Sequence, residues 1–81
     1  MKFEGTLTNP CYEDENGNII SVIEQENDFL VARISKEGDV EHIEAFTDIQ
    51  TATKMLHSYC EKQGYKAVKS NKLGYAFTWS W

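Results

Sequence analysis

The chain has 81 residues, which is enough for one small domain and too few for two. Hydrophobic residues make up 41% and charged residues 26%, and this balance excludes a disordered, collagen-like or disulfide-scaffold protein. Thirteen acids against eight bases give a formal net charge of −5. The apolar runs are far shorter than the roughly 20 residues of a membrane span, so a membrane-embedded class is not expected.

The cellular location and the redox state are predicted from two features. Residues 1–18 contain no apolar segment of the kind found in secretory signals, so we expect a cytoplasmic protein. Cys11 and Cys60 lie far apart and do not form the spacing of a disulfide framework. A reducing compartment would keep both as free thiols.

Charge is distributed unevenly along the chain. Residues 1–60 carry a net −8, whereas residues 61–81 carry a net +3. The acidic majority disfavours a broad duplex-binding surface, because such a surface needs several lysines or arginines on phosphates. The sequence leaves open whether the two regions form two differently charged faces or cancel each other.

The first part of the chain contains two short strand patterns and a turn. Lys2–Thr8 alternates apolar and polar residues, which is typical of a half-buried strand. Asn9–Asn18 is loop-like, and its residues 11–15 extend into a weak strand that pairs with the following segment. Asn16-Gly17 predicts a hairpin turn of type I′, in which both central residues need a positive φ.

Three segments rich in β-branched and aromatic residues follow, with a turn sequence between neighbours. They are Ile19–Glu26, Phe29–Ser35 and Val40–Phe46, separated by Asn27-Asp28 and by Lys36–Asp39. This pattern predicts an antiparallel meander. Arg33 would then face Glu41 across the second hairpin, and an exposed pair of this kind contributes less than about 1 kcal/mol.

The hydrophobic period then becomes helical. The apolar positions at this spacing are Ile49, Ala52, Leu56, Tyr59 and Cys60. Thr47 and Gln50 match a capping box, so we expect the helix to begin at Thr47 or Asp48. Gly64 suits the left-handed position that ends a helix, which places the last helical residue at Gln63.

Two strands are predicted after the helix, at Tyr65–Ser70 and Leu73–Trp81. The second places its large side chains on one face, at Leu73, Tyr75, Phe77, Trp79 and Trp81. We interpret this aromatic face as the core surface that packs against the helix. The resulting order, about β-β-β-β-α-β-β, predicts a single α+β domain over residues 1–81. One antiparallel sheet would carry one helix across one face.

The aromatic face also has two functional interpretations. Exposed rings at Trp79 and Trp81 would anchor a protein partner. Alternatively, rings would stack on the bases of single-stranded nucleic acid while nearby lysines contact phosphates. The candidate binding residues are Trp79, Trp81, Tyr75, Lys66, Lys69 and Lys72.

No catalytic or metal-binding motif is found. The potential soft ligands lack zinc-site spacing, and they are Cys11, His42, His57 and Cys60. Asp14–Asn18 superficially resembles a calcium loop, but Ile19 and Gln25 occupy the positions where an EF-hand needs Gly and Glu. We therefore interpret it as a solvated acidic hairpin tip, and we expect the meander acids to point into water.

These patterns favour a small, non-catalytic module that binds a protein partner. It would act as an adaptor, or as an inhibitor whose carboxylates occupy a basic surface. Binding of single-stranded nucleic acid is the alternative, which the acidic balance disfavours, and an enzyme is the least supported class. No cofactor and no metal are expected. Homodimerisation through an open sheet edge or through the tryptophans remains open.

Overall fold

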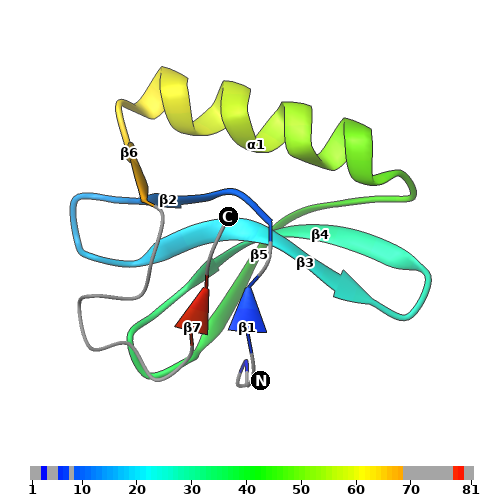
Figure 1. The fold of residues 1–81 in the computed structure, drawn as a ribbon, viewed down its shortest axis with the longest axis horizontal. Coiled ribbons are helices and arrows are strands. Elements are labelled where there is room, and N and C mark those ends of the chain that lie inside the picture. The colour runs from blue at the N-terminus through cyan, green and yellow to red at the C-terminus, as the bar shows by residue number, and fades with distance from the viewer. Residues whose placement is uncertain (1–2, 4–5, 8, 69–77, 80–81) are drawn as a thin grey trace.

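A five-stranded antiparallel sheet carries a single helix across one of its faces in the computed structural model of the chain (Figure 1). The structure describes residues 3, 6–7, 9–68 and 78–79. The sheet and the helix consist of β2 (Cys11–Glu13), β3 (Ile19–Gln25), β4 (Asp28–Ile34), β5 (Val40–Phe46), α1 (Ile49–Gln63) and β6 (Lys66–Val68). The strand order is β5-β4-β3-β2-β6. This arrangement confirms the α+β class, with one helix in the part of the chain that the structure describes.

Two further strands pair with each other outside this sheet. They are β1 (Thr6–Leu7) and β7 (Thr78–Trp79), which run parallel, with Thr6 opposite Thr78 and Leu7 opposite Trp79. Figure 1 shows this pair and α1 on opposite sides of the large sheet. The last predicted strand therefore pairs with the first one, whereas the sequence pattern placed it in the antiparallel sheet. Pairing between the two ends of a chain is non-local, and no turn residue signals it.

The meander is confirmed, with strand bounds within one residue of those predicted. The turn between β2 and β3 differs from the predicted one. Gly17 has a φ of 82° and donates from its amide to the carbonyl of Asp14, but Asn16 does not have a positive φ. A three-residue loop that ends in a left-handed glycine replaces the type I′ turn. In the next hairpin Glu26 has a φ of 46°, a conformation that costs a residue with a Cβ about 1–2 kcal/mol.

The sheet is buried on both faces. On the face beneath α1 the core consists of Tyr12, Ile20, Val22, Val31, Ala52, Leu56 and Cys60. On the other face it consists of Leu7, Cys11, Ile19, Ile23, Leu30, Ala32 and Ile34. Because successive residues of a strand point to opposite faces, the continuous burial of Ile19–Ile23 requires cover on both sides. Phe3 and Leu7 supply part of the cover on the face away from α1.

Among the described residues, the surface beneath the helix comes from β2 and the meander strands. The side chains of the predicted aromatic face, Leu73–Trp81, are not among those that the structure describes. Residues 73–77 and Trp81 lie outside the described residues, and for Trp79 the structure describes the backbone pairing only. The helical stripe itself is confirmed, because Ala52, Leu56 and Cys60 are its fully buried members.

Both ends of α1 are capped, although the first cap lies one residue later than the capping box predicted. The carboxylate of Asp48 accepts hydrogen bonds of 2.9 Å from the backbone amide and from the hydroxyl of Thr51. Asp48 is therefore the N-cap, and Thr47 is not. Gly64 has a φ of 78° and donates its amide to the carbonyl of Glu61, which confirms the predicted C-terminal glycine.

Loss of the N-cap is expected to destabilise the helix only when Asp48 is charged. The hydrogen bonds from Thr51 hold the pKa of Asp48 below its ordinary value, so the cap stabilises the fold at neutral pH and is lost as the pH falls through that lowered pKa. We expect Asp48→Ala to lower the Tm by a few degrees at pH 7 and to have little effect in strong acid. Asp48→Ser, which keeps an acceptor, and Thr47→Ala should both stay near the wild-type Tm in circular dichroism melts. An equal loss in Thr47→Ala would contradict the assignment of the cap.

Candidate functional site

Arg33 on β4 is the centre of a polar cluster beneath the C-terminal end of α1. Its guanidinium donates to Asp14 over 3.0 Å and to Glu41 over 2.8 Å. It also donates to the hydroxyls of Tyr59 and Tyr65, each over 3.3 Å. The pairing with Glu41 confirms the predicted cross-strand register of the second hairpin.

Asp14 is one of the two carboxylates of this cluster and is nearly buried, with 8% of the residue exposed. Its carboxylate accepts hydrogen bonds from the backbone amides of Asn16 and Asn18, in addition to the contact with Arg33. The interpretation of Asp14–Asn18 as a solvated acidic tip is therefore wrong for Asp14, because the loop curls around this carboxylate. Glu15 at the same tip is exposed, as expected.

The cluster stabilises the fold and does not offer a free cation to a ligand. Burial alone would lower the pKa of Arg33, but the contacts with Tyr59 and Glu41 raise it, so the side chain stays charged. Two carboxylates neutralise that charge, and four hydrogen bonds occupy most of the five donors of the guanidinium. Arg33 thereby joins the sheet, the hairpin after β2 and the end of the helix.

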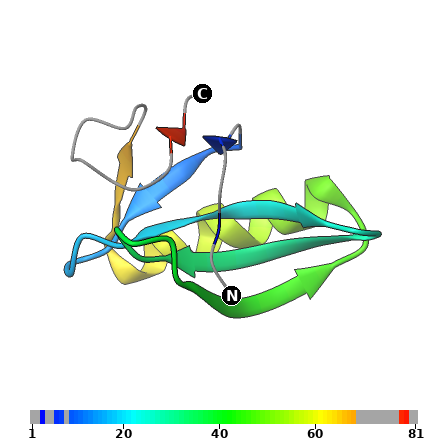
Figure 2. The ribbon, with the colours of Figure 1, turned by 90° about the horizontal axis from the view of Figure 1, so that it is seen from below.

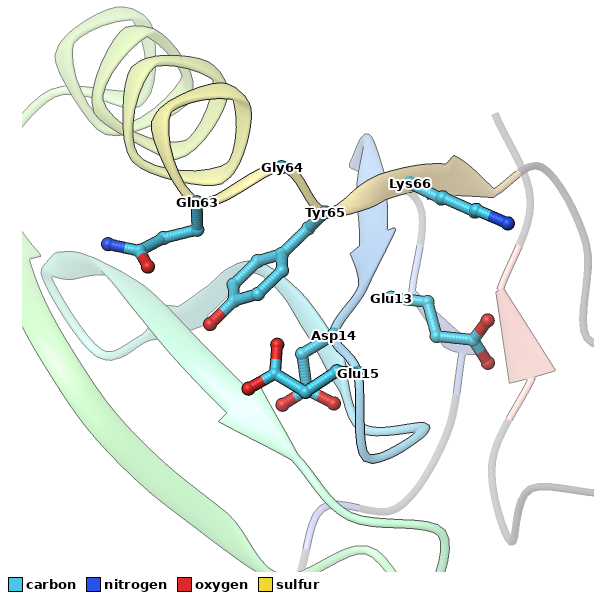
Figure 3. A pocket seen from close by; sticks show the side chains of 7 residues that line it. All are labelled: Glu13, Asp14, Glu15, Gln63, Gly64, Tyr65 and Lys66. Carbon is cyan, nitrogen blue, oxygen red and sulfur yellow. The ribbon is translucent and has the colours of Figure 1, made fainter.

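An open pocket of about 280 Å³ lies beside this cluster, between the β2–β3 hairpin and the end of α1 (Figure 3). It is lined by Glu13, Asp14, Glu15, Gln63, Gly64, Tyr65 and Lys66. In Figure 3 the ring of Tyr65 lies over the carboxylates of Asp14 and Glu15. Within the part of the chain that the structure describes, no group of three His, Cys, Asp or Glu side chains could hold a metal ion. The pocket is thus acidic without the geometry of a metal site.

The two cysteines lie on opposite faces of the sheet. Cys11 is buried on the face away from α1, and Cys60 is buried beneath the helix. Burial raises the pKa of Cys11 to about 11 and the pKa of Cys60 to about 12. Both thiols are therefore protonated at neutral pH and are poor nucleophiles.

His57 and Tyr12 form the other polar contact between the helix and the sheet. The Tyr12 hydroxyl lies 2.6 Å from Nδ1 of His57, and the rings meet edge to face with centroids 5.6 Å apart. Burial and the nearby charge of Glu61 raise the pKa of Tyr12, so its hydroxyl keeps its proton at neutral pH. His57 is thus engaged in a structural contact with the sheet.

The structure places two of the candidate binding residues. Lys66 is exposed on β6, directly opposite Glu13 of β2, and Figure 3 shows the two side chains extending in the same direction. Trp79 lies on β7 with its backbone opposite Leu7. Tyr75, Lys69, Lys72 and Trp81 lie outside the described residues. The proposed grouping of rings and lysines is therefore not tested by the described part of the chain.

The edge strand β5 carries part of the acidic meander surface that the sequence indicated. It forms one margin of the sheet (Figure 2), and it carries exposed Glu41, His42 and Glu44. Glu37 and Asp39, in the turn before β5, are also exposed. We call these four carboxylates, Glu37, Asp39, Glu41 and Glu44, the acidic edge. Their presence in the meander was visible in the sequence, but the position of the strand at the margin was not.

Comparisons with known proteins do not assign the chain to a family. No protein-family model, no curated protein and no solved structure matches the chain. Among the described residues, no helix is long and apolar enough to cross a membrane.

Proposed function

We propose that this domain is a non-catalytic module that binds a basic surface of a protein partner through the acidic edge. The observation that carries the proposal is the concentration of exposed carboxylates around β5 and its neighbouring turns. Residues 36–44 are all described, and within them the four exposed carboxylates of the acidic edge accompany one exposed lysine, Lys36. A surface with one sign of charge attracts a partner of the opposite sign and repels others of its own sign.

The buried groups support a binding role over a catalytic one. The two thiols are protonated and enclosed, and Arg33 is neutralised by its two carboxylate partners. A catalytic site needs a nucleophile or a proton-transfer group within reach of a substrate. Exposed acids on an open sheet edge are suited instead to contact lysines and arginines of another protein.

Binding of single-stranded nucleic acid is the weaker proposal for the described surface. Lys66 lies opposite Glu13, and a neighbouring carboxylate offsets the attraction of a lysine for phosphate. A titration of the full chain with oligonucleotides separates the two functions. Tryptophan quenching that weakens steeply with salt would favour nucleic acid, and an unchanged signal would favour the protein partner.

The proposed function predicts that one charge reversal on β5 weakens partner binding selectively. We expect Glu44→Lys to reduce capture of the partner from lysate of the source cells by about tenfold, because it places a cation against a basic surface. Glu24→Lys, an exposed glutamate on β3, is the matched control with the same change in charge. The measurement is quantitative mass spectrometry of proteins retained at low salt. Equal losses with both variants, or retention unaffected by Glu44→Lys, would contradict a site at the acidic edge.

A further inference from the structure

We infer that the partner contributes an extended basic segment that pairs with β5 as an added strand of the sheet, an inference that rests on the proposed function. The strand β5 contains seven residues, whereas β6 at the opposite margin contains three. Among the described residues, no strand pairs with the outer side of β5. A long open edge presents a row of backbone donors and acceptors to an incoming strand.

The side chains around β5 define the composition of that strand. Ile43 and Phe46 are half-buried and pack against the core beneath α1. Part of each side chain therefore stays open to solvent at this margin of the sheet. Glu41 and Glu44 pair with Arg33 and Val31, whose side chains lie on the helix face, so the two carboxylates share that face with Ile43 and Phe46. Lysines or arginines on the helix face of an incoming strand can therefore reach these carboxylates, and apolar residues would alternate with them on the other face.

A second copy of this chain is a poorer occupant of the same edge. Pairing β5 with another β5 would bring Glu41 and Glu44 close to the same residues of the second chain, and like charges across strands are destabilising. The strand also contains a bulge, since Val31 pairs with Glu44 and Ala32 pairs with His42, which leaves Ile43 as an extra residue. The bulge affects any added strand in the same way, so charge is what distinguishes the two occupants. A basic strand replaces this like-charge repulsion with attraction between its lysines or arginines and the carboxylates of β5.

The test uses two peptides of about ten residues in which lysine and valine alternate. The second peptide has the same sequence but carries N-methyl groups on alternate backbone amides, which removes strand hydrogen bonds and keeps the charge. We expect the unmethylated peptide to bind the full chain at least about tenfold more tightly, since several backbone hydrogen bonds distinguish the two. Amide hydrogen exchange measured by NMR should slow in β5 and remain unchanged in β6.

The outcomes separate this inference from the proposed function. Equal affinity of the two peptides, with both weakened by Glu44→Lys and not by Glu24→Lys, would overturn strand addition and leave the acidic edge as a binding surface. Absence of binding by both peptides, or protection confined to β6, would also overturn strand addition. The proposed function is judged separately, by capture of the partner from lysate.

Discussion

Replacement of Arg33 by methionine is expected to lower the free energy of unfolding by about 3 kcal/mol. The variant keeps the apolar stem but removes the cation from a carboxylate whose side chain is only 3% exposed. Breaking a buried ion pair from one side leaves the other charge uncompensated, and this cost exceeds the net value of the intact pair. We place the loss at the lower end of the usual range because Asp14 still accepts the amides of Asn16 and Asn18.

The second ion pair of Arg33 provides the matched control. The Glu41 side chain is 65% exposed, so Glu41→Gln should cost less than about 1 kcal/mol. Adding Asp14→Asn to Arg33→Met should recover part of the loss, and a double-mutant cycle measured by urea unfolding gives the coupling. A Glu41→Gln variant as unstable as Arg33→Met would show that burial does not distinguish the two pairs.

The local parts of this fold were predictable from the sequence. The length of the helix and its C-terminal end follow from a 3.6-residue period and from the glycine at position 64, and the structure gives that glycine a positive φ. The meander follows in the same way from strand patterns and turns. The one-residue error at the N-cap arose because Thr47 and Asp48 are both good cap residues, and tertiary packing decides between them.

The non-local parts were not predictable from the sequence. By contrast, the contact between Arg33 and Glu41 is local, because it spans only eight residues across one hairpin, and the register of that hairpin predicted it. The contacts of Arg33 with Asp14, Tyr59 and Tyr65 span 19, 26 and 32 residues, and no local pattern encodes them. The same limit applies to the acidic edge. The β-branched and aromatic residues of Val40–Phe46 indicate a strand, but only the strand order shows that it is an edge.

Burial on both sides of the sheet leads to the second large expected effect. Ile34 is fully buried on the face away from α1, and Leu56 is fully buried beneath the helix. A sheet covered only by its helix would leave the other face solvated, and truncation there would cost little. We expect Ile34→Ala to cost about 3 kcal/mol, similar to Leu56→Ala, because each removes enclosed apolar atoms and leaves a cavity.

The comparison with a half-buried residue makes this prediction specific to the two-sided core. Ile43 loses the same atoms as Ile34 on truncation to alanine, but its position at the margin lets solvent and neighbours fill the space. Urea unfolding should therefore rank Ile34→Ala near Leu56→Ala and well above Ile43→Ala in the loss of stability. A loss for Ile34→Ala as small as that for Ile43→Ala would mean that the face away from α1 is solvated. In that case the stability of the domain would depend on the helix face alone.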